Sequence, residues 1–364
     1  MHLILDPELL VNYAPRRRVW QGIPSVERTA GGRLFFTWYT GGTREEVGNY
    51  VLLATSEDGG LTVSDPIAVL APEEGCRCFD PELWIDPLGR LWWTASESPS
   101  TRVFAAVCDT PDGDLRFSDP RPIGEGIMMN KPIVTKEGWL FPMAKWGKNV
   151  GAGDVSLGEA GNLAHCVRTV DLGCTFTVLG GVDMPRRSFD EHQLVERRDG
   201  SLWMTVRTEY GIGEARSYDG GITWSEGRES GITGPSSRFA LRRLSSGNLL
   251  FVYHAHPDKR ENLTAYLSRD DGKTWEGGLL LDGRSQVSYP DVTERDGEIT
   301  VIYDRERGGF KESLAEAQSE AREILLARFT EEDILHGALL SSGGFLQRVI
   351  SRLGDYEGPE LFQQ

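Results

Sequence analysis

One short motif recurs five times along the chain at nearly even spacing. Residues 217–224 and 268–275 both read S-x-D-x-G-x-T-W, and residues 56–63 match with valine in the last place. Weaker copies begin at 110 and 169, so the five starts lie 54, 59, 48 and 51 residues apart. In such a turn the aspartate accepts backbone N–H bonds, glycine takes positive φ, and threonine and the aromatic residue anchor the turn. This repeat length is typical of one four-stranded blade of a β-propeller.

A second pattern lies between the motifs: a strand-like apolar run, a glycine turn, and another run rich in aromatic and β-branched residues. It occurs six times, at residues 23–39, 81–95, 132–144, 193–207, 239–253 and 292–303. Each of the first five copies is followed by a third strand that leads into a motif. We therefore expect an all-β fold, a six-bladed β-propeller of four-stranded antiparallel blades. Because such blades cannot bury their faces separately, we expect one domain spanning residues 1–364.

The sixth repeat has a third strand at residues 323–329 but no motif after it, so its blade needs a fourth strand from elsewhere. Ring closure by the amino end would supply one, and we expect residues 2–5 to pair there. Residues 308–321 are rich in Ala, Glu and Ser and are expected to form an exposed helical or mobile insertion.

The end of the chain carries helix signals. Thr330 followed by three acidic residues predicts the N-cap of a short helix. The tail from Ser341 places apolar residues at helical spacing, namely Phe345, Leu346, Val349, Ile350 and Leu353. We expect residues 330–364 to form a helical extension that packs either outside the ring or on a second subunit, which leaves a homo-oligomer possible.

Charge and cysteine content bear on partners and compartment. A formal net charge of −16 does not attract nucleic acid or an anionic membrane surface. The five cysteines are odd in number and none forms a C-x-x-C pair, which is typical of free thiols in a reducing compartment. The first residues lack the pattern of a signal peptide, and no run of about 18 apolar residues could span a bilayer. We expect a soluble cytoplasmic protein with neither a nucleic-acid nor a membrane partner.

The strand order predicts which face of the ring holds a site. Glycine turns join the first and second strands of each blade and the motifs join the third and fourth, so both turn types lie on one face. The opposite face gathers the starts of the first strands, the ends of the second strands and the loops that follow. Loops from all blades converge there on the central channel, where ligands usually bind. The polar residues at these places include Arg77, Asp80, Lys131, Glu191, His192, Arg207, Arg238, His256, Arg260, Tyr289, Asp304 and Arg305.

Several of these segments resemble the sialidase superfamily, and together with the motifs the resemblance covers nearly the whole chain. Residues 288–291 are similar to the family element whose tyrosine is the nucleophile, which implies that role for Tyr289. Residues 189–196 resemble the segment that carries the glutamate partner of the nucleophile, which implies that role for Glu191. The segments around Arg207 and Arg260 resemble those that bear two arginines of the family's carboxylate-binding triad. The resemblance implies an exo-glycosidase that binds an acidic glycan or a small acidic sugar.

The chain departs from the family pattern at two places. Sialidases open blade one with Arg-Ile-Pro, whereas this chain reads Gly22-Ile23-Pro24, so the first arginine of the triad is missing. The family's acid/base aspartate should fall in the loop 41–49, which contains Glu45 and Glu46 but no aspartate. The candidates for the general acid/base are therefore Glu45, Glu46 and Asp80. In addition, Tyr303-Asp304 stands where sialidases have Tyr-Glu.

The other polar residues of this face are candidates for substrate binding. Arg77, Lys131, Arg238 and Arg305 either replace the cationic surface lost with the first arginine or form salt bridges between blades. His192, His256 and Asp304 complete the set of candidates. A metal site is also conceivable at His192, His254 and His256, since residues two apart on a strand face the same side. No third ligand stands at a recognisable spacing, so we expect neither a metal nor a cofactor.

A tyrosine nucleophile suits a sugar with a carboxylate on its anomeric carbon, because a neutral phenol avoids charge repulsion; sialidases are the tyrosine exception among glycosidases. A free phenol titrates near ~10, so Glu191 has to accept its proton. We therefore expect a retaining glycosidase.

Tyr289 could instead be a core residue, and Arg207 could form a structural ion pair with Glu191. Two other functions stay open: a uronate-directed lyase in which Tyr289 or His192 moves the proton, and a non-catalytic carbohydrate-binding propeller, which the incomplete triad favours.

Overall fold

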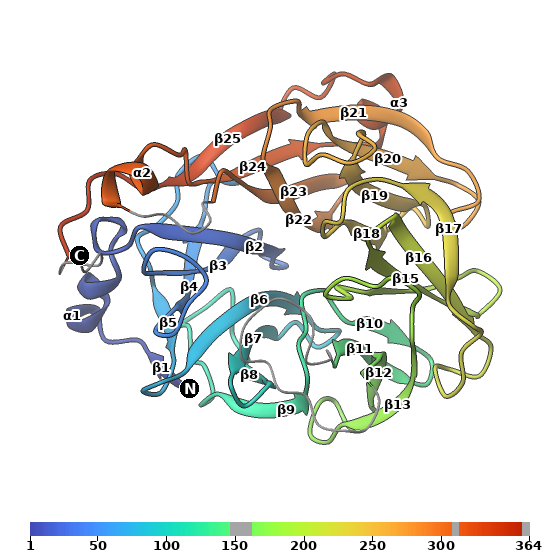
Figure 1. Ribbon diagram of the computed structural model, residues 1–364, viewed down its shortest axis with the longest axis horizontal. Coiled ribbons are helices and arrows are strands. Elements are labelled where there is room, and N and C mark those ends of the chain that lie inside the picture. Colours follow the sequence, from blue (N-terminus) through green and yellow to red (C-terminus); the bar gives the residue numbers. More distant parts are fainter. Residues whose placement is uncertain (146–161, 308–312, 359–364) are drawn as a thin grey trace.

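Six antiparallel sheets stand around a central axis as the blades of a propeller (Figure 1). The computed structural model describes residues 1–145, 162–307 and 313–358. Within these residues, five sheets have four strands each and one has five. The expected all-β, six-bladed architecture is confirmed.

The blades follow one another along the chain. Blade one contains β2 (Trp20–Arg28), β3 (Leu34–Gly41), β4 (Tyr50–Ser56) and β5 (Ala68–Ala71). Blade two contains β6 (Arg77–Ile85), β7 (Leu91–Ser98), β8 (Arg102–Cys108) and β9 (Arg121–Glu125). Blade three contains β10 (Ile133–Thr135), β11 (Gly138–Ala144), β12 (Ala164–Thr169) and β13 (Thr177–Val182). Blade four contains β14 (Gln193–Glu196), β15 (Leu202–Thr208), β16 (Gly211–Ser217) and β17 (Arg228–Thr233). Blade five contains β18 (Ala240–Arg243), β19 (Leu249–His254), β20 (Leu263–Ser268) and β21 (Glu276–Asp282). Blade six contains β22 (Val287–Arg295), β23 (Glu298–Arg305), β24 (Glu323–Phe329) and β25 (Phe345–Arg352).

The ring closes differently from the expectation. The amino-terminal strand β1 (His2–Ile4) pairs with β5 and adds a fifth strand to blade one. Blade six receives its outer strand from the carboxyl end instead, because β25 pairs with β24. The prediction that residues 2–5 close blade six is wrong, and so is the prediction that the tail is helical.

Irregular pairing explains the misleading apolar spacing of the tail. The ladder between β24 and β25 shifts register twice, between Ile324 and Leu325 and between Leu326 and Arg328. Each bulge places an extra residue in β25, and each extra residue moves the inward-facing position by one. The two-residue period of a strand is thereby broken into a spacing that resembles a helix.

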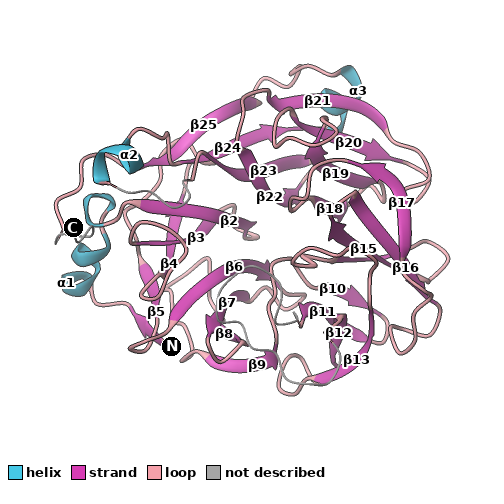
Figure 2. Ribbon diagram, viewed as in Figure 1, coloured by secondary structure: helices cyan, strands magenta, loops and turns pink. Residues whose placement is uncertain are grey.

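The helices are short and lie at the rim of the disc (Figure 2). They are α1 (Pro7–Leu10), the 3₁₀ turns η1 (Val11–Tyr13) and η2 (Pro15–Arg17), α2 (Leu314–Gln318) and α3 (Glu331–His336). Thr330 caps α3 in a reciprocal capping box with Asp333, which confirms the predicted N-cap. Helix α2 lies in the expected insertion, of which residues 308–312 are outside the described residues. No helix in the described part of the chain has the length and apolar character needed to cross a membrane.

The motifs form hydrogen-bonded turns. In the copy at 217–224, Ser217 Oγ donates to Asp219 Oδ1 at 2.8 Å, and Asp219 accepts from the backbone and hydroxyl of Thr223 at 2.9 and 2.6 Å. The weaker copy in blade two differs, because Asp112 accepts bonds from Thr29 and from Gly31 N, in the glycine turn of blade one. Glycine turns and motif turns of adjacent blades are therefore in contact on one face, as predicted.

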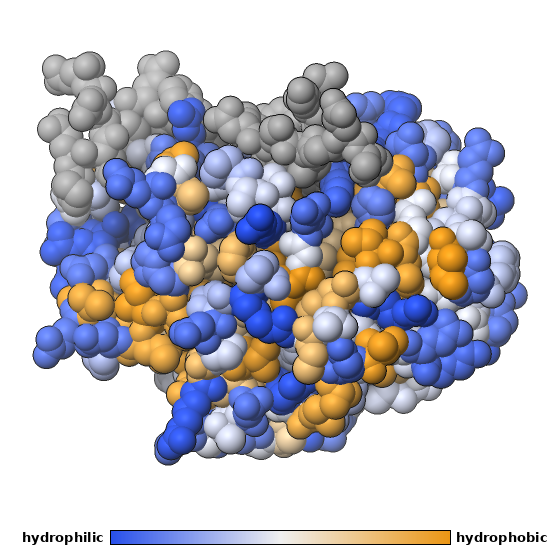
Figure 3. Space-filling view, turned by 90° about the horizontal axis from the view of Figure 1, so that it is seen from below, coloured by the Kyte–Doolittle hydropathy of each residue, from blue (hydrophilic) through white to orange (hydrophobic). Residues whose placement is uncertain are grey.

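The edge of the disc mixes polar and apolar side chains. Figure 3 shows the edge that lies at the bottom of Figure 1, where hydrophilic residues surround separate hydrophobic patches. The inner parts of the blades are apolar, and the interface of blades two and three packs an aromatic cluster of Trp84, Trp92, Trp139, Phe141 and Phe176. This packing fixes the relative positions of the strand starts that form the site.

Candidate active site

Three blades begin with the same backbone distortion. Ile23, Asp80 and Tyr289 have φ of 56°, 50° and 55°, and each is followed by proline. At each of these places the ladder between the first and second strands shifts register. A non-glycine residue in this conformation costs about 1–3 kcal/mol and persists only where the surrounding structure holds it. The distortion turns these side chains out of the sheet and toward one shared pocket.

Blade four enters the same pocket through a longer distorted segment. Phe189, Asp190 and Glu191 have successive φ values of 61°, 53° and 44°. The backbone N–H of Arg207, on β15, donates to the carbonyl of Asp190 at 2.7 Å and fixes this segment to the sheet. Glu191 is thereby brought to the axis of the ring.

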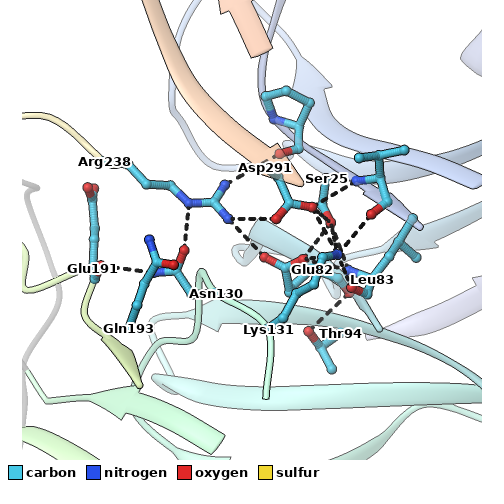
Figure 4. Close-up of polar contacts among 12 residues, drawn as sticks. Ser25, Glu82, Leu83, Thr94, Asn130, Lys131, Glu191, Gln193, Arg238 and Asp291 are labelled. Carbon is cyan, nitrogen blue, oxygen red and sulfur yellow. Dashed lines mark hydrogen bonds and ion pairs between the residues drawn. The ribbon is translucent and has the colours of Figure 1, made fainter. Parts of the chain in front are cut away.

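The side chains two positions further along enter the central channel beneath the pocket. Ser25, Glu82, Lys131, Arg238 and Asp291 form a buried group that we call the channel cluster (Figure 4). Lys131 Nζ lies 3.0 Å from both Glu82 Oε1 and Asp291 Oδ2. Arg238 Nη2 lies 2.9 Å from Glu82 Oε2. Burial and the carboxylate of Asp291 raise the pKa of Glu82 to about 7, against the opposing charges of Lys131 and Arg238.

The pocket has a volume of about 190 Å³ and lies where the strand starts meet. Its walls come from all six blades. The lining residues are Ile23, Glu45, Arg77, Phe79, Asp80, Met129, Phe189, Glu191, Arg207, Arg260, Tyr289 and Arg307.

Tyr289 and Glu191 are in hydrogen-bond contact at the bottom of the pocket. Tyr289 Oη donates to Glu191 Oε1 at 3.0 Å, and both side chains are buried. Arg207 Nη1 donates to the same Glu191 oxygen at 2.6 Å and to Tyr289 Oη at 3.2 Å. Burial, and then the negative charge of Glu191, raise the pKa of Tyr289, so the phenol is protonated at neutral pH. A nucleophilic tyrosine here needs a base, and Glu191 is within reach to act as one.

Two further arginines lie over the ring of Tyr289. The guanidinium carbon of Arg260 is 5.5 Å from the ring centroid and that of Arg307 is 4.3 Å from it. Arg260 Nη2 also donates to the carbonyl of Ser236 at 3.0 Å. Among the described residues no carboxylate lies within ion-pair distance of Arg260. Three cations around one phenol, including Arg207, suit an anionic ligand group bound next to the reactive oxygen.

Asp80 and Glu45 are the acidic candidates that line the pocket. Asp80 is 4% exposed, and burial followed by the charges of Glu45 and Glu191 raises the pKa of its carboxyl well above the usual range. Glu45 lies at the mouth with 40% of its side chain exposed and its Oε1 3.7 Å from Arg307 Nη2. Glu46 does not line the pocket, since its carboxylate accepts from the backbone N–H of Thr43 within the same loop.

Of the cationic candidates, one lines the pocket, two lie below it in the channel cluster, and one lies outside the pocket lining. Arg77 lines the pocket, with its guanidinium 4.5 Å from the ring of Phe79. Lys131 and Arg238 lie below it in the channel cluster, where their partners are carboxylates and backbone carbonyls. Arg305 lies outside the pocket lining and pairs with Glu323 at 3.3 Å and Glu306 at 2.5 Å.

The remaining candidates lie around the pocket. His192 Nε2 is 2.7 Å from the carbonyl of His165, and burial lowers the His192 pKa to about 4. His256 is in the loop after β19, where its Nδ1 accepts from the backbone of Asp258 and Lys259. Asp304 is buried and holds Ile23 N at 2.9 Å and Ser288 Oγ at 2.7 Å. In the part of the chain that the structure describes, no group of three His, Cys, Asp or Glu side chains could hold a metal.

Arg307 is a charged pocket residue that the sequence analysis missed. It follows the end of β23, and its Nη1 lies 3.4 Å from Asp304 Oδ2. A Cβ atom built on Gly22 would lie 2.6 Å from Arg307 Cδ, so the side chain occupies space next to this glycine. The signal in the sequence that could have pointed to Arg307 is Gly22, which stands where the first arginine of the sialidase triad is missing.

Comparisons with known proteins identify a family and relatives for this chain. A family model described as a BNR repeat-like domain matches residues 32–301. The sialidase of Vibrio cholerae serotype O1 is 28% identical over an alignment of 137 residues, with 31% of this chain and 17% of that protein covered. The chain thus matches less than a fifth of the length of that curated relative.

Solved sialidase structures share the fold. A Hadza microbial sialidase has a TM-score of 0.63 at 19% identity, with 78% of this chain and 63% of that chain covered. The leech intramolecular trans-sialidase, complexed with 2,7-anhydro-Neu5Ac, has a TM-score of 0.63 at 15% identity, with 90% and 70% covered. The intramolecular trans-sialidase from Ruminococcus gnavus gives 0.62 at 15% identity, with 89% and 97% covered. These structures share the propeller fold of this chain, and since the family model spans most of the chain, the chain belongs to the BNR repeat-like domain family.

Proposed function

We propose that the protein is a retaining exo-glycosidase that hydrolyses a terminal acidic sugar. The observation that carries the proposal is the 3.0 Å contact between Tyr289 Oη and Glu191 Oε1 inside a pocket where three arginines surround the phenol. A nucleophile and its base within hydrogen-bond reach are the signature of covalent catalysis.

In the first step Glu191 accepts the proton of Tyr289, and the phenolate oxygen attacks the anomeric carbon. The bond from that carbon to the aglycone oxygen breaks, and the leaving oxygen takes a proton from Asp80. We assign the acid to Asp80 because it lines the pocket and because burial and the charges of Glu45 and Glu191 raise the pKa of its carboxyl, which favours the protonated form that a general acid needs.

In the second step the Asp80 carboxylate accepts a proton from water, whose oxygen attacks the same carbon. The bond to Tyr289 breaks, and the phenolate recovers its proton from Glu191. Two displacements at one carbon give net retention of configuration. The arginines bind the sugar's carboxylate throughout, since forked guanidinium hydrogen bonds suit a carboxylate.

His192 is poorly placed for the proton transfer of a lyase. It is not among the residues that line the pocket, and its Nε2 lies 2.7 Å from the carbonyl oxygen of His165. Tyr289 could still serve as the base of an elimination, so the assay has to follow the product as well as the rate.

A panel of nitrophenyl glycosides of acidic sugars tests the proposal. We expect turnover in the wild-type protein and a loss of about 10³-fold or more in Tyr289→Phe. Wild-type binding of an acidic sugar with no turnover of any member would instead support a carbohydrate-binding propeller. An unsaturated product, detected by its ultraviolet absorbance, would support elimination.

A further inference from the structure

We infer that Arg307 is the third anion-binding arginine of the pocket, and that it takes this role because position 22 is glycine. The inference rests on the proposed function only in using the same pocket. It concerns the recognition of the ligand's carboxylate, which can be measured without turnover.

Arg307 and position 22 compete for one space. A Cβ on Gly22 would lie 2.6 Å from Arg307 Cδ, 3.0 Å from Arg307 Cβ and 3.0 Å from Asp304 Oδ2. Real Cβ atoms do not approach carbon atoms as closely as 2.6 Å, so any side chain at position 22 has to displace Arg307. The arginine therefore reaches the pocket only because blade one leaves this space open.

The surroundings hold Arg307 in a defined orientation. Its Nη1 lies 3.4 Å from Asp304 Oδ2, its Nη2 lies 3.7 Å from Glu45 Oε1, and only 19% of its side chain is exposed. Its guanidinium carbon lies 4.3 Å from the ring centroid of Tyr289. Asp304 is itself fixed by Ile23 N and Ser288 Oγ. An ion pair with a fixed carboxylate, stacked on an aromatic face, restricts the rotamers of an otherwise flexible side chain.

The three arginines differ in how far their charge is already compensated. Arg207 is 2.6 Å from Glu191, and Arg307 is at longer range from Asp304 and Glu45. Arg260 has no carboxylate partner among the described residues. Arg260 and Arg307 also line a second hollow beside the pocket, together with Lys259 and Gln286. Arg260 and Arg307 therefore have the capacity to bind a ligand carboxylate next to the phenol.

The test compares one acid with its neutral ester. The probes are a 2,3-unsaturated N-acetylneuraminic acid analogue and its methyl ester, with binding measured by calorimetry. The wild-type protein should bind the acid more tightly than the ester. Arg307→Ala should weaken binding of the acid about 10- to 100-fold, as expected for loss of a charged hydrogen bond, and leave the ester unchanged. Arg305→Ala is the matched control, because that arginine pairs with Glu323 outside the pocket.

A reciprocal exchange tests the role of position 22. Gly22→Arg alone should weaken binding of the acid, because both arginines cannot occupy the space. The double variant Gly22→Arg, Arg307→Ala should recover at least part of the acid preference, since the new side chain can occupy the space that Arg307 leaves.

Two results would overturn the inference. One is an Arg307→Ala variant that binds the acid as the wild-type protein does. The other is a wild-type protein without a preference for the acid over the ester, including one that binds neither. If the acid preference depends on Arg307 but Tyr289→Phe retains turnover, the arginine assignment stands and the proposed mechanism fails.

Discussion

The side chain of Asn130 holds the backbone of Glu191. Asn130 Nδ2 donates to the carbonyl oxygen of Glu191 at 2.8 Å and to that of His192 at 3.0 Å. Its Oδ1 accepts from Arg238 Nε at 3.0 Å, so Asn130 connects the channel cluster to the base of the pocket (Figure 4). Because Glu191 has a φ of 44°, these bonds help to maintain a backbone conformation that is otherwise unfavourable.

Asn130→Ala should therefore lower activity without removing a group that touches the substrate. We expect kcat/KM to fall about 10- to 100-fold and the free energy of unfolding to fall by about 1–3 kcal/mol, the cost of unpaired buried groups. The pH profile of kcat/KM should also shift, because Glu191 moves relative to Tyr289. Asn248→Ala is the control, since its amide bonds Glu331 on the turn face. A destabilised variant with unchanged kcat/KM and an unchanged profile would show that Asn130 does not position Glu191.

Asp190 should make stability depend on pH. Burial raises the pKa of Asp190 to about 7, and neither of its carboxylate oxygens has a hydrogen-bond partner among the described residues. Because the pKa is raised in the folded state, the contribution of Asp190 to the free energy of unfolding is fully present below about pH 4. This contribution is lost as the pH rises through about 7. Asp190→Asn removes this loss, which amounts to up to about 4 kcal/mol. Thermal unfolding should show a larger gain for the variant at pH 8 than at pH 5, whereas equal gains would contradict the prediction.

Asp80→Asn should discriminate between leaving groups. Without the acid, hydrolysis of an alkyl glycoside should slow by about 10²- to 10⁴-fold, while a nitrophenyl glycoside, whose leaving group needs no proton, should be affected much less. In the wild-type protein, activity should fall as the pH rises through the pKa of Asp80. This fall should be absent in Asp80→Asn. Glu45→Gln serves as the comparison. If the leaving-group dependence appears in Glu45→Gln and not in Asp80→Asn, the acid is Glu45.

The channel cluster should be sensitive to loss of its lysine. Lys131→Met leaves the carboxylates of Glu82 and Asp291 buried with one cation fewer, which should cost about 3–5 kcal/mol of unfolding free energy in urea. Lys145→Met breaks an ion pair with the exposed Glu125 and should cost less than about 1 kcal/mol. Adding Glu82→Gln to Lys131→Met should recover part of the loss. Similar values for both lysine variants would show that the cluster does not stabilise the ring.

The architecture could be predicted from sequence because its signals are local. Asp219 and Thr223 lie four residues apart, and the hydrogen bonds between them lie within the motif itself. Such turns join the third and fourth strands of a blade, so the direction of every strand follows from them. This was enough to predict the face that carries Tyr289 and Glu191. The outer strand of blade six could not be predicted, because bulges in its pairing with β24 disturb the period of Phe345–Arg352.

The site was only partly predictable, because the depth at which a side chain lies in the channel depends on how blades that are far apart in the sequence pack together. Glu191 and Tyr289 line the pocket, while Gln193 and Asp291, two residues later, lie deeper. This alternation was available in the sequence and could have assigned Arg238 to the channel. Arg307 was beyond such reasoning, because its position depends on the space beside Gly22, which lies in another blade.

Mass spectrometry of a trapped intermediate tests the central claim most directly. A 2,3-difluoro acid sugar with a good leaving group should form an aryl glycoside with the phenol oxygen of Tyr289 faster than that covalent intermediate is hydrolysed. The account predicts one added sugar on the peptide that contains Tyr289, with no label in Tyr289→Phe and slow labelling in Glu191→Gln. A wild-type protein that turns over the parent glycoside while its label is found on another residue would contradict it.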